Sequence, residues 1–245
     1  LYGGKMKNGV YVAICYICNE KCSFCPCTKR EKLEQKIVNV NSLFFLFKQL
    51  QEQHCMQITI SGGEPTLHPN FIEIISFAQK CGMYVTVLSN GENFANNAFV
   101  NEIKKCIDIT KLRIITTLHS SIPEKHELVN KSKGSFHKSV AGLKNMYELG
   151  AKIEIKHCIT KENIRQLEQF YLYCDNEFPE NVNIQFCGID YVGIEKKQLE
   201  KAFLSSEDIK EQLENTFDLY LNKRKHGSKR HLYAINIPLC ACDVY

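Results

Sequence analysis

The chain has 245 residues, 44% of them hydrophobic, which is enough for one large domain with a substantial buried core. Its 31 basic and 27 acidic residues leave a net charge of +4, too small to indicate a nucleic-acid-binding protein. No apolar stretch reaches the roughly 18 residues of a membrane helix, so we expect no membrane partner.

Thirteen cysteines make up about 5% of the chain, below the roughly 8–10% of short disulfide scaffolds. Their number is odd, and no apolar signal peptide precedes the first expected strand. Clustered thiols in a reduced compartment bind metals or carry redox chemistry more often than they form disulfides. We therefore expect a cytoplasmic protein.

Runs rich in β-branched residues alternate along the chain with segments of helical periodicity. The alternation predicts a parallel sheet with right-handed crossovers, and its six units predict an α/β fold of the partial (β/α)6 TIM-like barrel type. A last helix and strand form a C-terminal extension. The expected strands are 10–15, 57–61, 84–88, 112–118, 152–159, 182–187 and 232–237, and the expected helices are 43–51, 71–81, 95–105, 136–149, 164–174 and 207–221.

The expected domain division places a barrel at residues 1–200 and an extension at 201–245, packed on the barrel. Within the extension, "NKRKHGSKRH" at 222–231 is the one sharp change of composition. We interpret it as a solvated connection between helix and strand, because runs of charge usually have that role. The alternative is a docking surface for an acidic peptide or a phosphate backbone.

The segment "ICNEKCSFCPC" at 17–27 directly follows the first expected strand. In parallel α/β folds, ligands bind at the carboxyl ends of the strands, so this position favours a functional site. Zinc sites place two C-x2-C pairs roughly 15–20 residues apart, whereas the pairs here are separated by three residues. The remaining pattern, Cys18-x3-Cys22-x2-Cys25, supplies three thiolates that can hold three irons of a [4Fe–4S] cluster and leave the fourth iron open.

The other cysteines receive mostly structural interpretations. Cys81, Cys106 and Cys174 fall on apolar helix faces and are predicted to be buried. Cys27 and Cys187 are candidates for proximity to the active site, with a buried structural role favoured for Cys187. Cys15 is assigned to the first strand.

The segment "CNEKCSFC" resembles the C-x3-C-x2-C signature of the radical S-adenosylmethionine (radical SAM) enzymes, including the aromatic residue before the third cysteine. "SGGEP" at 61–65 resembles the family's GGE motif, whose backbone meets the amino group of the methionine moiety, and glycines allow such an approach. "LSNG" at 88–91 and "TTLHSS" from residue 116 resemble the segments that follow the third and fourth strands. The resemblance covers about residues 10–190.

The resemblance implies which residues hold the cofactors. The cluster ligands are Cys18, Cys22 and Cys25, with S-adenosylmethionine at the open iron. Its implied contacts are Phe24, Gly62, Gly63, Glu64, Ser89, Asn90 and Thr117.

The same resemblance implies that an external electron donor of the flavodoxin or ferredoxin type reduces the cluster, and that S-adenosylmethionine is cleaved to a 5′-deoxyadenosyl radical, which abstracts a hydrogen atom from the substrate. We assign no catalytic side chain. His119, His126 and His157 are interpreted as hydrogen-bonded structural residues.

The segment "YAINIPLCACDVY" at 233–245 resembles the "PLC" stretch before the cysteine-rich tail of peptide-modifying radical SAM enzymes, including the His-Xaa-Ser system maturases. This resemblance implies a ribosomally made peptide as substrate, an auxiliary iron–sulfur cluster held in part by Cys240 and Cys242, and a tail beyond residue 245. A small molecule or a tRNA remains an alternative substrate, although nucleic acid is not the expected partner. From a different class, a non-catalytic metal-binding or electron-transfer protein remains an alternative.

Overall fold

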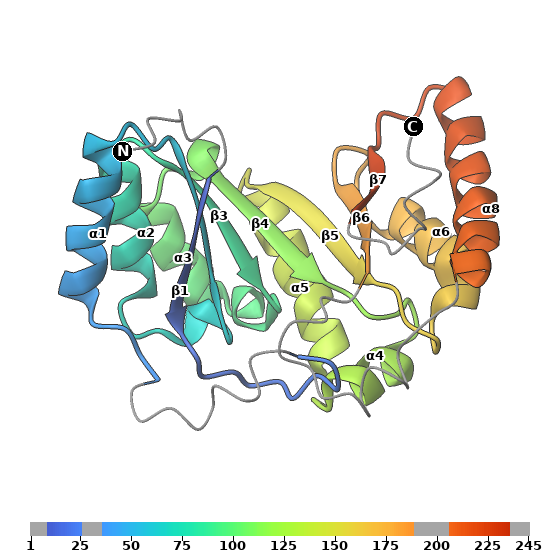
Figure 1. The fold of residues 1–245 in the computed structure, drawn as a ribbon, viewed down its shortest axis with the longest axis horizontal. Coiled ribbons are helices and arrows are strands. Elements are labelled where there is room, and N and C mark those ends of the chain that lie inside the picture. Colours follow the sequence, from blue (N-terminus) through green and yellow to red (C-terminus); the bar gives the residue numbers. More distant parts are fainter. Residues whose placement is uncertain (1–8, 26–35, 189–205, 236–245) are drawn as a thin grey trace. The chain divides into compact units, whose positions relative to one another are not determined.

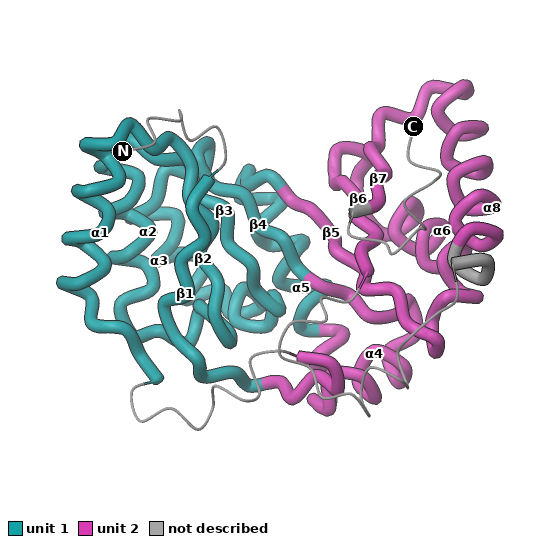
Figure 2. The backbone as a smooth tube through the Cα atoms, viewed as in Figure 1, with its two compact units in different colours: residues 1–19, 29–116, 138–152 teal, residues 20–28, 117–137, 153–245 magenta. Residues whose placement is uncertain are grey.

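The computed structural model describes residues 9–25, 36–188 and 206–235. The chain forms two compact units, each built from several segments of the sequence (Figure 2). Unit 1 comprises residues 1–19, 29–116 and 138–152, and unit 2 comprises 20–28, 117–137 and 153–245. The boundary between Asn19 and Glu20 falls inside the cysteine segment, so each unit carries part of it.

Unit 1 is built from parallel strands that pair in chain order, each joined to the next through a helix (Figure 1). This order is the one that right-handed βαβ crossovers produce. Its elements are β1 (Val10–Cys15), α1 (Val40–Glu52), β2 (Gln57–Gly62), α2 (Phe71–Lys80), β3 (Tyr84–Ser89), α3 (Asn97–Cys106), β4 (Leu112–Thr117) and, from residue 138 onward, α5 (Ser135–Glu148).

The core of unit 1 follows from strand alternation and helix periodicity. Ile58 and Ile60 of β2 are buried two residues apart, whereas Ile74 and Ile75 of α2 lie fully buried on one helix face. Asn70 precedes α2 as predicted, but its side chain does not cap the helix. Its Nδ2 instead donates to Glu73 Oε2 at 3.0 Å.

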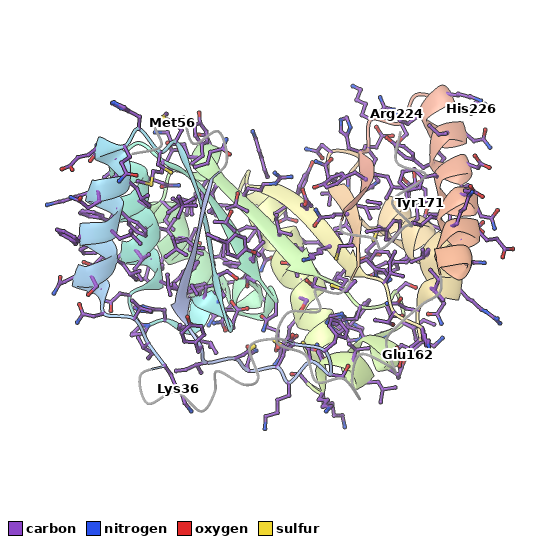
Figure 3. All side chains as sticks on the ribbon, viewed as in Figure 1. Lys36, Met56, Glu162, Tyr171, Arg224 and His226 are labelled. Atoms are coloured by element: carbon purple, nitrogen blue, oxygen red, sulfur yellow. The ribbon has the colours of Figure 1, made fainter. Side chains whose placement is uncertain are left out.

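Unit 2 contains three further parallel strands, again paired in chain order. Helix α6 packs against α8. The ring of Tyr171, labelled in Figure 3, meets that of Tyr220 edge to face, with 6.3 Å between centroids. The elements are α4 (Pro123–Asn130), β5 (Lys152–Cys158), α6 (Leu167–Glu177), β6 (Asn183–Cys187), α8 (Ser206–Lys225) and β7 (Leu232–Ile235).

The predicted α/β class with parallel strands is confirmed, as are the helix and strand of the extension, which are α8 and β7. Helix α4 was not predicted. The expected domain boundary at residue 200 lies outside the described residues and stays a prediction. Within the described residues, no helix has the length and apolar composition needed to cross a bilayer.

The interpretation of 222–231 as a solvated connection is wrong in part. Its first four residues continue α8, where Arg224 Nη1 donates to the hydroxyl of Tyr220 at 3.0 Å. Arg230 is fully buried, and its guanidinium donates to the carbonyls of Val182 and Phe178 at 2.6 and 2.7 Å. Asp175 of α6 pairs with both Arg230 and Lys223. Two of the basic residues therefore hold unit 2 together, which lowers the charge available to a partner.

The predicted burial of helix cysteines is confirmed for Cys81 and Cys174, which are 8% and 0% exposed. It is wrong for Cys106, which is exposed at the end of α3. The helical pattern gives the face of a residue only approximately near a helix end, where the turn frays.

Candidate functional site

The thiols around residue 20 differ sharply in their surroundings. Cys15 is fully buried in β1, where its Sγ donates to the carbonyl of Glu64 at 3.2 Å, and burial raises the pKa of its thiol to about 11. Cys18, Cys22 and Cys25 are partly exposed, and none is in a disulfide. A metal ligand must be a deprotonated thiolate, so Cys15 fits a structural role while the other three suit ligation.

In unit 1, the two glycines of the GGE segment allow the chain after β2 to pass very close to the chain after β1. Gly62 has a φ of 138°, and a Cβ there would lie 2.0 Å from the carbonyl oxygen of Cys15. A Cβ on Gly63 would lie 2.3 Å from the carbonyl oxygen of Ile17. The close approach that requires glycine is therefore, in this structure, an approach to the chain leading into Cys18.

The carboxylate of Glu64 joins the ends of β2 and β3. It accepts hydrogen bonds from the backbone and hydroxyl of Thr66 at 3.0 and 2.6 Å, from the Ser89 hydroxyl at 2.8 Å and from the Asn90 N–H at 2.7 Å. Glu64 is 1% exposed, and burial raises the pKa of its carboxyl while these donors lower it. The predicted contacts Glu64, Ser89 and Asn90 are thus brought together in one network.

A second network of unit 1 reaches the residue after Cys18. Asn90 Nδ2 donates to Asn19 Oδ1 at 2.7 Å, and Asn19 Nδ2 donates to Glu92 Oε1 at 2.7 Å. Lys138 of α5 pairs with the same Glu92 at 3.3 Å. Sequence reasoning missed Asn19 and Glu92, and the only signal in the sequence was their position beside the two motifs.

In unit 2, the backbone of the cysteine loop is held by the end of α4. The N–H of Lys21 donates to the carbonyl of Asn130 at 2.8 Å, and the N–H of Ser23 donates to the carbonyl of Val129 at 3.0 Å. The last carbonyls of a helix lack partners within the helix, so they are available to a neighbouring chain. A turn closed by the Cys25 N–H to the Cys22 carbonyl, at 3.1 Å, follows directly.

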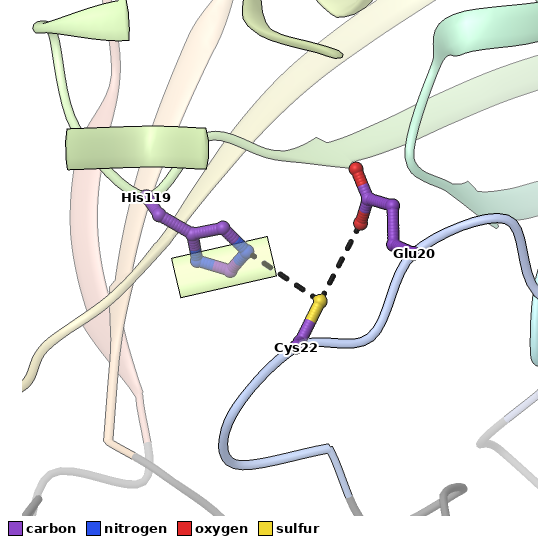
Figure 4. A group of neighbouring side chains, drawn as sticks. All are labelled: Glu20, Cys22 and His119. Carbon is purple, nitrogen blue, oxygen red and sulfur yellow. Dashed lines mark hydrogen bonds between the residues drawn. The ribbon is translucent and has the colours of Figure 1, made fainter. Parts of the chain in front are cut away.

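Glu20, Cys22 and His119 offer three ligand atoms within 4.8 Å of one another (Figure 4). The Cys22 thiol donates to Glu20 Oε2 at 3.4 Å, and its sulfur lies 3.9 Å from His119 Nε2. The predicted contact Phe24 meets the ring of His119 edge to face, with 5.5 Å between centroids. The sequence signal for Glu20 and His119 was their place in the two segments that resemble the family motifs.

Three histidines of unit 2, His119, His126 and His157, are buried. Burial, reinforced by the neighbouring histidines, lowers the pKa of His119 well below its ordinary value, and burial lowers the pKa values of His126 and His157 to about 4. His126 Nδ1 accepts from the His119 N–H at 3.1 Å, and His157 Nδ1 lies 2.8 Å from the carbonyl of Leu118. The rings of His126 and His157 are hydrogen-bonded, as expected, and their structural role stays a prediction. Among the described residues, Nδ1 of His119 and Nε2 of His157 have no hydrogen-bond partner.

Thr117 lies at the end of β4 with a partly exposed side chain. Among the described residues, no hydrogen bond joins it to the cysteine loop, so its assignment rests on the motif alone. Cys27, Cys240 and Cys242 lie outside the described residues.

The donor set fits the expected cluster. Three partly exposed thiols from one loop, with a fourth thiol excluded by burial, match the three-ligand pattern of an iron–sulfur site with an open iron. A cysteine, a histidine and a carboxylate are also a set that zinc accepts, so Glu20, Cys22 and His119 are compatible with iron or zinc. The similarity to known proteins distinguishes the two metals.

Two relatives and one solved structure illustrate the range of similar proteins. The chain is 28% identical over 157 residues to the S-adenosylmethionine-dependent nucleotide dehydratase of Flammeovirga pacifica, covering 61% of this chain and 52% of that one. It is 24% identical over 179 residues to the mycofactocin maturase MftC of Mycobacterium ulcerans, covering 70% and 47%. The structure of Streptococcus suis SuiB bound to its precursor peptide SuiA matches 94% of this chain and 49% of that one, with a TM-score of 0.73 and 16% identity.

The chain spans about half the length of these proteins. At 16% identity, the likeness to SuiB shows the fold alone, and it confirms the expected barrel-like α/β architecture. The family model described as "Radical SAM superfamily" matches residues 12–174, which include every described residue of the cysteine loop and both strand-end networks. The chain therefore belongs to the radical SAM superfamily of enzymes, whose cofactors are a [4Fe–4S] cluster and S-adenosylmethionine.

Proposed function

We propose that this chain holds a [4Fe–4S] cluster through Cys18, Cys22 and Cys25. The observation that carries the proposal is the contrast between these partly exposed thiols and the buried thiol of Cys15, whose raised pKa opposes ligation. When bound, the cluster supplies the electron that cleaves S-adenosylmethionine to methionine and a 5′-deoxyadenosyl radical. An external donor of the flavodoxin or ferredoxin type is part of the proposal.

The surrounding residues of each unit act by positioning. In unit 1, Glu64 fixes the ends of β2 and β3, and the Asn90 amide fixes the chain beside Cys18 through Asn19. We assign the contacts to S-adenosylmethionine to Gly62, Gly63 and Ser89 around this anchor, and to Phe24 and Thr117 in unit 2. Glu64 and Asn90 of unit 1 keep their proposed role in binding S-adenosylmethionine, and their side chains hydrogen-bond to the protein.

The proposed substrate is a ribosomally made peptide. Two of the similar proteins support it, because SuiB was solved with a precursor peptide and MftC is a maturase. The second candidate is a small molecule, favoured by the 28% identity to a nucleotide dehydratase. Auxiliary cluster ligation by Cys240 and Cys242 belongs to the peptide proposal and predicts a loss of iron when both become alanine.

The first experiment is anaerobic reconstitution with iron and sulfide, followed by S-adenosylmethionine and dithionite, with 5′-deoxyadenosine measured by mass spectrometry. The parent chain is expected to form the product, and a variant with Cys18, Cys22 and Cys25 changed to alanine is expected to form none. Cys106→Ala is the matched control, since it removes an exposed thiol far along the chain. Equal product from the triple variant, or zinc in place of iron, contradicts the proposal.

A second experiment separates the substrates. The reconstituted chain is given either a candidate precursor peptide encoded beside its own gene or a mixture of nucleoside triphosphates. A change in peptide mass together with 5′-deoxyadenosine supports the peptide, and a change confined to the nucleotides supports the small molecule.

A further inference from the structure

Cys158 and Cys187 lie side by side in unit 2, where neither belongs to the proposed cluster site. They are register partners at the carboxyl ends of the neighbouring strands β5 and β6. Cys187 donates a hydrogen bond from its thiol to Cys158 Sγ at 3.5 Å. Neither is a lone structural thiol. Their pairing was not predicted from the sequence. The sequence analysis favoured a buried structural role for Cys187 and assigned no role to Cys158.

Strand alternation places the pair on one face of the sheet with a basic side chain. Side chains two residues apart on a strand share a face, so Lys156 and Cys158 point the same way. His157 lies on the opposite face, where its ring packs 4.0 Å from that of Phe170 of α6. The pair therefore lies on the face away from α6, with an ammonium group beside it.

The backbone holds both residues in place. Asn163 Nδ2 donates to the carbonyl of Cys158 at 2.8 Å, and the N–H of Ile159 donates to the carbonyl of Cys187 at 2.8 Å. Neighbouring strands lie roughly 4.8 Å apart, within the roughly 4.4–6.8 Å between Cα atoms that disulfides accept. The two sulfurs lie 3.5 Å apart and must approach to the bond length of about 2.05 Å for a disulfide to form.

The two thiols are electrostatically unequal. The hydrogen bond from Cys187 is the main cause that lowers the pKa of Cys158, and the charge of Lys156 adds to it. The same hydrogen bond, with burial, raises the pKa of Cys187. Cys158 is also the more exposed of the two, since Cys187 is only 2% exposed. Thiolate character and access both favour Cys158 as the attacking sulfur.

We propose that Cys158 and Cys187 form a thiol–disulfide exchange site, with a low-molecular-weight disulfide such as glutathione disulfide as its substrate. The Cys158 thiolate attacks one sulfur of glutathione disulfide, so a mixed disulfide forms and one glutathione thiolate leaves. Cys187 then loses its proton to solvent and attacks Cys158 Sγ, releasing the second glutathione. The protein pair loses two electrons and two protons, and one glutathione disulfide becomes two glutathione molecules.

The test uses the full chain, reduced and desalted under anaerobic conditions, then incubated with glutathione disulfide and alkylated. Peptide mapping without reduction is expected to find a disulfide between Cys158 and Cys187, which dithiothreitol reverses. Cys187→Ala is expected to retain glutathione on Cys158, and Cys158→Ala is expected to keep Cys187 as a thiol. Because mapping assigns each cysteine, the thiols of the cluster loop do not confuse the result.

Cys106 and Cys174 are internal controls within the same sample. Cys106 is exposed and reports that glutathione disulfide is active, whereas Cys174 is fully buried and reports that the chain stays folded. Lys156→Gln is expected to slow modification of Cys158 by about threefold to tenfold, because it removes a charge that favours the thiolate.

Three results would overturn the proposal: glutathione remaining on Cys158 of the parent chain, both cysteines staying reduced while Cys106 reacts, or Cys187 reacting at the parental rate in Cys158→Ala. Equal thermal unfolding midpoints for parent and variants show that a negative result does not come from misfolding. The test requires no cluster and no S-adenosylmethionine, so it succeeds or fails independently of the proposed radical chemistry.

Discussion

Two buried carboxylates, Glu64 in unit 1 and Glu20 in unit 2, have different kinds of donor. Glu64 accepts from Ser89, Thr66 and Asn90, which all belong to the protein scaffold of its own unit. Glu20 accepts from the amide of Asn130 and from the thiol of Cys22, a proposed cluster ligand. A metal-bound thiolate carries no proton, so ligation removes a donor from Glu20 and none from Glu64. Unit 1 thus offers a network that is complete without metal, whereas the network of unit 2 changes when metal binds.

The largest effect is expected from breaking the complete network. Glu64→Ala leaves the Ser89 hydroxyl, the Thr66 hydroxyl and the Asn90 N–H without their acceptor in a buried site. We expect a loss of about 3 kcal/mol or more in the free energy of unfolding, measured by urea titration. Glu73→Ala, an exposed change on α2, is the control and should stay within about 0.5 kcal/mol. A similar loss of unfolding free energy in both variants would show that the hydrogen bonds to Glu64 do not stabilise unit 1 more than an exposed carboxylate does.

A smaller loss is expected from the support of Glu20. Asn130→Ala removes the amide that donates to Glu20 Oε1 at 2.7 Å, while its carbonyl still accepts from Lys21. We expect a cost of about 2 kcal/mol in unfolding free energy and a lower iron content after reconstitution. Asn145→Ala, which removes an amide bonded to the Phe94 carbonyl in unit 1, should leave the iron content unchanged. An iron content equal to that of the parent in Asn130→Ala would show that iron binding by the loop does not depend on this amide of α4.

Acid is expected to weaken unit 2 through its buried histidines. His126 has a pKa of about 4 in the folded chain and an ordinary value of 6.5 when unfolded, so between these values the unfolded state binds the extra proton. Its contribution to stability is complete above pH 6.5 and falls as the pH drops toward 4. From pH 7 to 5 we expect His126 to cost between about 1 and 2 kcal/mol, and His126→Gln to reduce that slope. An unchanged slope in the variant would mean that another group causes the acid sensitivity.

The smallest effect is expected at the surface of the unit 1 network. Lys138 pairs with Glu92 at 3.3 Å, but its side chain is 58% exposed. Lys138→Ala should therefore cost less than about 0.5 kcal/mol, with a difference that disappears in high salt. A larger, salt-independent loss would show that the ion pair, rather than the Asn19 amide, holds Glu92.

Much of this arrangement was predictable because its signals are local. Strands such as β2 and β3 alternate buried and less buried residues, and the motifs fall at their ends. Helix α4 was missed because it has eight residues, begins at a proline and carries little apolar periodicity. Its contribution to the site comes through backbone carbonyls, which the side-chain sequence does not encode.

Contacts between distant segments were the other part that the sequence could not supply. Asn90 contacts Asn19 across 71 positions, and Cys187 meets Cys158 across 29. The prediction for Arg230 was wrong for the same reason. A run of basic residues normally indicates a solvent-exposed segment, yet the guanidinium of Arg230 is buried against Asp175 and two carbonyls. Each such contact depends on strand register and helix placement, which are properties of the folded chain.

The attachment of the cysteine loop to α4 has a consequence for synthesis of the protein. The loop's backbone partners, Val129 and Asn130, are made more than one hundred residues after Lys21. At roughly 5–20 residues per second, translation takes about 5 to 20 seconds to cover that stretch. Nascent chains therefore display Cys22 and Cys25 on the ribosome before the helix that anchors their loop exists, and metal insertion during that interval would have to proceed without this anchor.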